Sequence, residues 1–193
     1  MALHETGRHR GALSRRAQHG DESAFSELAY GIGDRLFALA SRILRDGDLA
    51  EDATQQAIVT IWRELPALRD PARFEAWTYR ILVNACNAEA RRERRWRPSL
   101  HVLDADTRGT DTDDPQLTVT ARDELERGFR RLPPEQRAVL VLQHYLDLSL
   151  PQISGLLGVP IGTVRSRLHY ARNAMRAALE ADARHAMREG RMA

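Results

Sequence analysis

The chain has no lysine, one cysteine and no long apolar run. Its 29 basic residues are all arginine, whose planar guanidinium suits phosphates and guanine edges, although a GC-rich genome would produce the same bias. The lone Cys86 excludes a disulfide framework and a CxxC metal site. The opening stretch MALHETGRHRGALSRR lacks the apolar core of a signal peptide, and no segment approaches membrane-spanning length. A cytoplasmic protein without membrane insertion is therefore expected.

The composition is that of a globular protein. Of its 193 residues, 42% are hydrophobic and 29% are charged, which is too apolar for wholesale disorder. The length allows one ordinary domain or two small ones. The formal net charge is only +2, so any basic surface must come from local clustering of arginines.

Apolar residues recur at helical spacing along most of the chain, and no stretch reads convincingly as a strand. The pattern predicts an all-α protein of two small helical domains joined by a flexible acidic linker. The expected segments are a mobile tail over 1–20, a first domain over 21–97, the acidic linker over 98–118, a second domain over 119–182 and a tail over 183–193.

Capping residues and prolines predict where the helices begin and end. Asp21 is the expected N-cap of a helical region over 21–45, which Gly31 and Gly33 would break in two. A capping-box-like sequence at 48–51 starts the next helix. The remaining helices are expected from Pro71 to about Trp96, over 119–131 and over 134–146.

The stretch LPQISGLLGVPIGTVRSRLHYAR, residues 150–172, predicts two short helices hinged at Gly158. Ser149 and Gln152 form a capping box at its start. The expected buried stripe of the second helix is Val164, Leu168, Ala171, Met175 and Leu179, which leaves Arg165, Ser166, His169 and Asn173 outward and Arg167 and Arg172 on the flanks. This pattern is typical of a DNA-reading helix-turn-helix. An amphipathic surface helix with a solvated basic face is the alternative.

The sequence NACNAEARRERRWR, residues 84–97, ends a helix with five arginines. Capping of the helix dipole would explain basic side chains at this end, but five exceed what capping requires. Several aromatic residues share the domain, namely Trp62, Phe74, Trp77, Tyr79 and Trp96. Aromatic rings beside a basic surface suit unpaired bases, whereas the spacing of Phe74 and Trp77 fits core packing equally well.

No catalytic constellation is present. The seven histidines are scattered without an HExxH motif, and no glycine-rich phosphate loop follows a strand. Cys86 stands among inward-facing residues, as expected of a buried structural thiol. The chain is therefore not expected to be an enzyme or to hold a metal ion or cofactor.

Three stretches in order resemble the extracytoplasmic-function (ECF) group of bacterial sigma factors. DLAEDATQQAIVTIWRELP (48–66) resembles the polymerase-binding helix of that family, and ARFEAWTYRILVNACNAEARRERR (72–95) resembles its promoter-melting and −10-reading segment. LPPEQRAVLVLQHYLDLSLPQISGLLGVPIGTVRSRLHYAR (132–172) resembles its −35-reading domain. The ordered set is far more specific than the hinge motif alone.

The resemblance implies roles for individual residues. The polymerase-binding residues would be Asp52, Gln55 and Gln56, which would contact the clamp helices of the β′ subunit, although the family usually carries an acid where Gln56 stands. The −10 and melting residues would be Trp77, Arg80, Asn84, Arg91, Arg92, Arg94 and Arg95, with Asn84 reading a flipped base beside the loop 65–70. The −35 residues would be Thr163, Arg165, Ser166, Arg167, His169 and Arg172.

The tether between the domains bears on the partners. Its 21 residues could span about 70 Å fully extended but would average only about 25 Å as a relaxed coil. A third component must therefore hold two readers of one promoter apart, and core RNA polymerase is the natural candidate. The resemblance also admits an anti-sigma factor as a partner. The alternative function is a free-standing helix-turn-helix regulator that binds an operator as a dimer.

Overall fold

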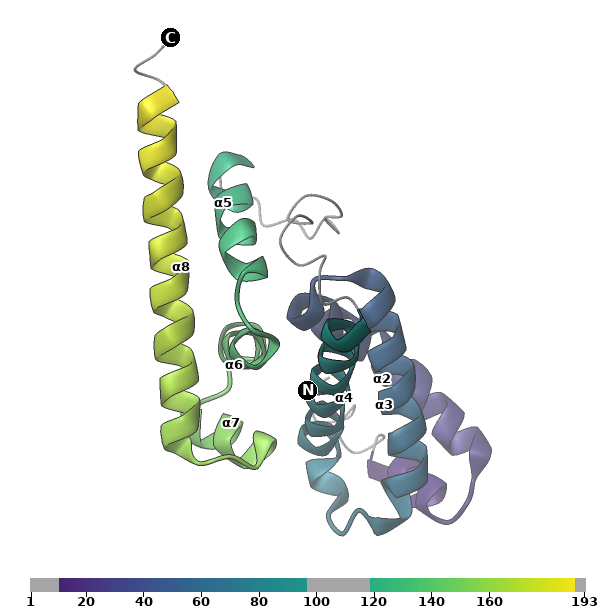
Figure 1. The fold of residues 1–193 in the computed structure, drawn as a ribbon. Coiled ribbons are helices and arrows are strands. Elements are labelled where there is room, and N and C mark those ends of the chain that lie inside the picture. Colours follow the sequence, from purple (N-terminus) through teal and green to yellow (C-terminus); the bar gives the residue numbers. More distant parts are fainter. Residues whose placement is uncertain (1–10, 97–118, 190–193) are drawn as a thin grey trace. The chain divides into compact units, whose positions relative to one another are not determined.

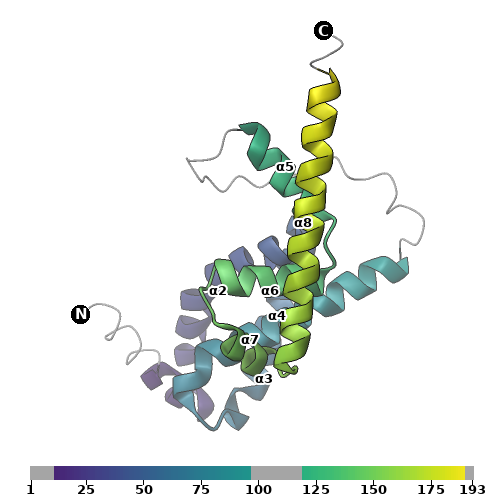
Figure 2. The same ribbon diagram turned by 90° about the vertical axis from the view of Figure 1, so that its left-hand side faces the viewer.

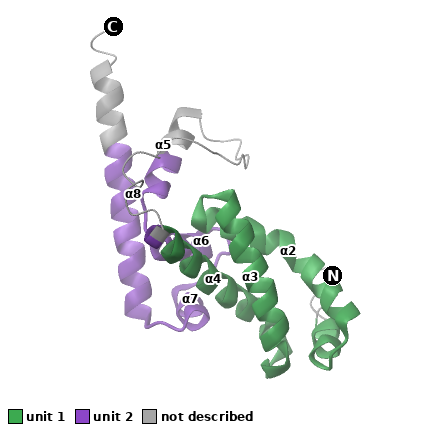
Figure 3. Ribbon diagram, turned by 45° about the vertical axis from the view of Figure 1, so that its right-hand side comes forward, with its two compact units in different colours: residues 1–93 green, residues 94–193 purple. Residues whose placement is uncertain are grey.

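The computed structural model describes the backbone of residues 11–96 and 119–189, and the side chains of 11–95 and 125–180. Within these ranges the secondary structure is helical and contains no strand, which confirms the all-α prediction. The chain divides into two compact units, residues 1–93 and 94–193, with the division in the last turn of one helix (Figure 3). None of the described helices is long and apolar enough to cross a membrane.

Unit 1 is built on three long helices (Figure 1), joined in part by two short 3₁₀ turns. In order these are α2 (Glu22–Leu44), α3 (Gly47–Glu64), η1 (Leu65–Ala67), η2 (Pro71–Arg73) and α4 (Phe74–Trp96). α2 and α3 lie side by side, and Arg35 of α2 pairs with Glu75 of α4. A second ion pair, between Asp52 of α3 and Arg92, fixes the other end of α4. The three helices therefore form one bundle.

The core of unit 1 combines large aliphatic side chains on α2 with small ones on α3. Leu36, Leu39 and Ile43 of α2 are at most 1% exposed, and the facing Ala53 and Ala57 of α3 are fully buried. Because alanine leaves room at the contact, the α2 and α3 backbones can approach closely. Further buried residues of this unit are Leu28, Ala50, Ile61, Leu65, Leu82, Val83 and Cys86.

Two details of the predicted helices are wrong. α2 is continuous through Gly31 and Gly33, because the burial of its apolar stripe outweighs a cost of about 1 kcal/mol for each glycine. α3 begins at Gly47, one residue before the predicted capping box, because the Asp46 carboxylate accepts a hydrogen bond from Leu49 N at 3.0 Å. Arg45, at φ 59°, makes the left-handed turn between the two helices.

The prediction of a mobile tail over 1–20 is wrong for residues 11–20. Residues 1–10 lie outside the described ranges. Residues 11–18 are helical, and Leu13, Ser14 and Ala17 are buried against the rest of the unit. Arg16 then pairs with Asp21 at 2.7 Å. The polar composition of the segment concealed this helix, since only two apolar side chains in it are buried.

Asp21 joins this first helix to α2. Its Oδ1 accepts hydrogen bonds from Ser23 Oγ at 2.6 Å and Ala24 N at 2.9 Å, and its Oδ2 accepts one from Arg16 Nε at 2.9 Å. These donors, with Ser23 contributing most, hold the pKa of Asp21 well below its ordinary value of 3.8.

We therefore expect the wild type to be more stable than Asp21→Asn by an amount that depends on pH. The substitution keeps a capping oxygen but loses the charge. A lowered folded-state pKa stabilises the fold fully above the unfolded value, and this contribution falls away as the pH drops below about 3.8. Thermal unfolding measured between pH 6 and pH 3 should show that the difference in melting temperature between the two proteins becomes smaller as the pH falls. A constant gap across this range would contradict the assigned role of the carboxylate.

Unit 2 consists of α5 (Val119–Arg130), α6 (Pro134–His144), α7 (Leu150–Leu157) and α8 (Ile161–Glu189). α5 and α7 both lie against α8, α7 near its N-terminal end, and α6 contacts both α7 and α8 (Figures 1 and 2). α8 runs through the predicted tail to Glu189, so residues 183–189 are helical rather than a tail. The predicted linker over 98–118 lies outside the described residues.

The predicted hinge is confirmed. Gln152 Oε1 accepts hydrogen bonds from Ser149 N at 2.8 Å and from Ser149 Oγ at 2.7 Å, which closes the capping box at the start of α7. Gly158 ends α7 at φ 66°, a conformation that costs an L-residue about 1–2 kcal/mol. Ser154 Oγ donates to Val159 O at 2.7 Å and so fixes the turn toward α8. Of the apolar side chains of α7, Ile153 and Leu156 are buried and Leu157 is half-buried.

Candidate nucleic-acid interface

The N-terminal half of α8 presents the predicted polar face. Val164, Leu168 and Ala171 are buried, and this fixes the rotation of the helix. The predicted −35 residues divide into the exposed Arg165, Ser166, His169 and Arg172 and the half-buried Thr163 and Arg167. Further along the predicted buried stripe, Met175 and Leu179 are only half-buried, and Ala178 is buried instead.

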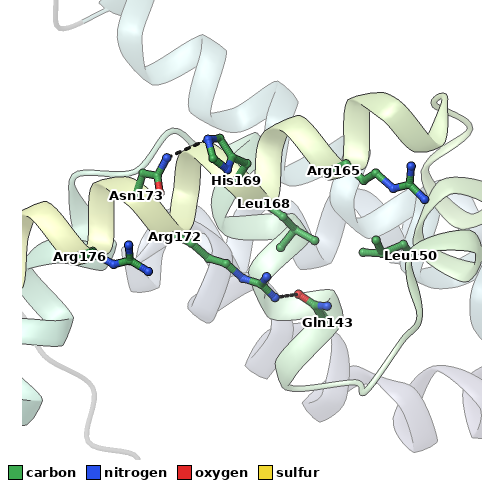
Figure 4. Close-up of a pocket in the computed structure, with 8 residues that line it drawn as sticks. All are labelled: Gln143, Leu150, Arg165, Leu168, His169, Arg172, Asn173 and Arg176. Atoms are coloured by element: carbon green, nitrogen blue, oxygen red, sulfur yellow. Dashed lines mark hydrogen bonds between the residues drawn. The ribbon is translucent and has the colours of Figure 1, made fainter.

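A hollow of about 390 Å³ lies on this face (Figure 4). Its lining holds three guanidinium groups and no carboxylate, so its field favours an anion. The lining residues are Gln143, Leu150, Arg165, Leu168, His169, Arg172, Asn173 and Arg176. The three arginines of the lining come from α8, and Gln143 comes from α6.

Hydrogen bonds already position several of these side chains (Figure 4). Arg172 Nη2 donates to Gln143 Oε1 at 3.0 Å, which braces this arginine across from α6. The amide of Asn173 lies 2.9 Å from His169 Nε2, and Ser166 Oγ donates to Thr163 O at 3.0 Å. Arg165 extends from α8 beside Leu150, and its five N–H donors have no hydrogen-bond partner in the described part of the chain.

The second candidate face runs along α4. Trp77, Arg80, Asn84, Arg91 and Arg95 recur at intervals that place all five within about 60° of one another around a helix of 3.6 residues per turn. Trp77 is half-buried and the other four are exposed. This row, called the α4 stripe below, is about 27 Å long at 1.5 Å per residue. It is therefore long enough to meet several successive nucleotides.

Arg92 does not belong to the α4 stripe. Its Nη2 donates to Asp52 Oδ2 at 3.0 Å and lies 2.9 Å from Glu89 Oε2, an ion pair without hydrogen-bond geometry. The sequence predicts that Arg92 binds DNA phosphates and that Asp52 binds the polymerase. In the structure the two side chains form an ion pair between α3 and α4, and each is still about half exposed. Arg91, Arg94 and Arg95 are exposed and have no ion-pair partner among the described residues.

The predicted polymerase-binding residues lie on the exposed face of α3. Asp52, Gln55 and Gln56 are all exposed, and Gln55 donates to Glu51 Oε1 at 3.2 Å. Val59 continues the same face one turn further on and is 51% exposed. Sequence reasoning missed Val59, because it counted only the inward stripe of this helix.

The aromatic residues divide between core and surface. Phe74 is buried, so the core interpretation holds for it, whereas Trp77 is only half-buried. Tyr79 is buried as well, and Arg35 lies 5.7 Å from the centre of its ring. Trp62 is partly exposed but packs on Phe25 at 4.6 Å between ring centres. Trp77, 6.0 Å from Phe74, is the described aromatic residue on the α4 stripe. The Trp96 side chain lies outside the described residues.

Among the described residues no cluster of histidine, cysteine or acidic side chains could hold a metal ion. Cys86 is buried in unit 1 and forms no disulfide within the described ranges. The α8 face and the α4 stripe together offer positive charge, hydrogen-bond donors and one indole ring.

Comparison with known proteins covers both units. The model of Sigma-70 region 2 matches residues 32–96, and that of Sigma-70 region 4 matches residues 122–175. The RNA polymerase sigma-H factor of Pseudomonas aeruginosa is 30% identical over 179 residues, which cover 87% of this chain and 92% of that one. The ECF RNA polymerase sigma factor SigW of Bacillus subtilis is 28% identical over 176 residues, or 84% and 92% of the two chains.

A solved structure of CnrH in complex with the cytosolic domain of CnrY is similar over 90% of this chain and 99% of CnrH, with a TM-score of 0.60 and 26% identity. The α4 stripe lies within the matched region 2, and the predicted −35 residues of α8 lie within the matched region 4. The chain therefore belongs to the extracytoplasmic-function group of RNA polymerase sigma factors, which bind core RNA polymerase and direct it to promoters.

Proposed function

We propose that the two units divide promoter recognition between them: α8 reads the −35 element in duplex DNA, and the α4 stripe holds one strand of the melted −10 element. The observation that carries the proposal is the hollow on α8, which combines three arginines without an acid on the outward face of a hinged helix pair. A helix of this kind enters the major groove with its exposed side chains toward base edges.

On α8, Arg165 is the direct reader. Its guanidinium is exposed and uncommitted, and it can bond both O6 and N7 of a guanine. The Ser166 hydroxyl donates its hydrogen to Thr163 O, so in this conformation Ser166 can only accept a hydrogen bond from a base. Arg172 is held by Gln143, and a held cation suits a phosphate, whose contact positions the helix on the duplex.

On α4, Asn84 is the reader of an extruded base. A carboxamide carries both donors and an acceptor, as the pairing edge of a base requires. Extrusion costs a few kcal/mol of unstacking, which stacking on Trp77 and hydrogen bonds to Asn84 would offset. Arg80, Arg91 and Arg95 flank Asn84 on the same stripe and would hold the phosphates of the strand. Arg94 is exposed to one side and would add a further phosphate contact.

The exposed face of α3 is the proposed contact with the clamp helices of the β′ subunit. Gln55, Gln56 and Val59 offer hydrogen bonds around an exposed apolar side chain, a combination common at protein interfaces. Asp52 is exposed and would contact the polymerase beside the ion pair that it forms with Arg92. The chain itself would catalyse nothing, would act in the cytoplasm, and would bind an anti-sigma factor, as the complex of CnrH with a second protein suggests by analogy.

Run-off transcription with purified core RNA polymerase tests this assignment. A genomic fragment library transcribed with and without the protein should yield defined transcripts only in its presence, and their upstream sequences should share a −35 and a −10 element. Sequence-specific binding by the protein alone, without any transcript, would instead favour the free-standing regulator, which binds an operator as a dimer.

A further inference from the structure

The helix over residues 11–18 is tied to the loop between α3 and α4. Gln18 Nε2 donates to Leu68 O at 2.6 Å and to Leu65 O at 3.2 Å, across 50 and 47 residues of sequence. Both bonds are partly buried, and the burial of Leu13 and Ala17 holds the helix against the unit. The contact therefore joins two segments that the sequence keeps far apart.

The loop itself satisfies only one of these two carbonyl groups. Leu65 O, where α3 passes into η1, also accepts a hydrogen bond from Leu68 N at 3.1 Å, whereas Leu68 O accepts none from the backbone of the described residues. Leu68, at ψ 107°, leaves the helical conformation, so its carbonyl turns away from the preceding turn. A carboxamide nitrogen has two hydrogens, and Gln18 directs both at this bend. Gln18 thus helps set the direction in which the chain leaves α3.

The far end of the loop is fixed as well. Asp70 Oδ1 accepts a hydrogen bond from Ala72 N at 3.0 Å, and its other oxygen lies 3.4 Å from Arg73 Nε. Between the two anchors Pro66, Ala67 and Arg69 are exposed. The loop therefore presents a defined outward surface at the N-terminal end of α4, next to the Trp77 end of the α4 stripe.

We propose that Gln18 is a positioning residue for promoter recognition: by bonding Leu65 O and Leu68 O it shapes loop 65–70 to contact the −10 strand beyond Trp77. The inference rests on the proposed role of the α4 stripe. It extends −10 recognition to the N-terminal helix, which lies ahead of the matched region 2.

The test replaces Gln18 by methionine, which is similar in length but donates no hydrogen bond. Holoenzyme assembled from core RNA polymerase and the full chain is assayed on promoters randomised at the −10 and −35 elements. Gln18→Met should lower discrimination at one or two −10 positions about 2- to 10-fold, the effect of a lost hydrogen bond. Discrimination at −35 should stay unchanged, and the amides of residues 68–70 should exchange hydrogen faster.

A matched control separates positioning from stability. Ile43→Val removes one buried methyl group of unit 1, away from the loop, and should lower the melting temperature without changing any base preference. If Gln18→Met likewise lowers the melting temperature and leaves every base preference unchanged, the positioning role is wrong.

A second variant distinguishes the two proposals. If Asn84→Ala changes −10 preference and Gln18→Met does not, only the inference about Gln18 fails. If Asn84→Ala leaves every −10 preference intact, the assignment of the α4 stripe fails, whatever Gln18→Met does, and the inference falls with it.

Discussion

Replacing Ile153 by alanine is expected to destabilise unit 2 strongly and to weaken −35-dependent transcription. Ile153 is fully buried in α7, a helix of only eight residues held by its contacts with α6 and α8. Truncation of a buried isoleucine costs about 2–5 kcal/mol. Domains are stable by only about 0.05–0.15 kcal/mol per residue, or about 5–15 kcal/mol for a unit of this size, so the substitution removes roughly a third of the stability of unit 2. Thermal unfolding followed by circular dichroism should reveal an early transition, and the full chain should bind −35 duplexes more weakly as the temperature approaches it.

The matching substitution in the other unit is Leu36→Ala, at a position 1% exposed on α2. It should lower the transition of unit 1 while leaving −35 duplex binding intact, because each unit has its own core. If either substitution lowered both transitions equally, the two units would unfold as one, and the separate roles proposed for them would lose their physical basis.

The second large effect is expected at Arg165. Arg165→Ala should reduce discrimination among −35 sequences by about 1–3 kcal/mol, or roughly 5- to 150-fold, at the position where this side chain meets a guanine. Arg165→Lys should recover part of the affinity but little of the discrimination, since an ammonium lacks the planar fork. Quantitative transcription from a set of single-base −35 variants measures both quantities.

Arg176→Ala is the control for Arg165, because Arg176 lines the same hollow three turns further along α8. If Arg176 contacts a phosphate, Arg176→Ala should weaken binding to all −35 sequences alike and reduce the slope of log K against log salt by about 0.9. Should Arg165→Ala behave in this uniform way, Arg165 would be a phosphate contact and would leave the reading set.

Short-range patterns predicted much of this molecule. The hinge at Gly158 and the capping box of Ser149 and Gln152 depend on residues adjacent in sequence, and both are present as predicted. Periodicity predicted the buried positions Val164, Leu168 and Ala171 of α8, and it also placed Arg165 and His169 on the exposed side. The prediction failed at Gly31 and Gly33, where the burial of one whole helix face outweighs two unfavourable local preferences.

Local spacing and the order of motifs along the chain are enough to predict the helical fold class, the helix-turn-helix and the family. Which charged side chains remain available, in contrast, depends on how the helices pack. The tertiary structure pairs Arg92 with Asp52 across 40 residues, buries Phe74 and Tyr79, and brings Gln18 to the carbonyls of Leu65 and Leu68. Helical periodicity gives the direction of a side chain from its own helix axis, but a partner supplied by a distant helix appears only when the helices pack.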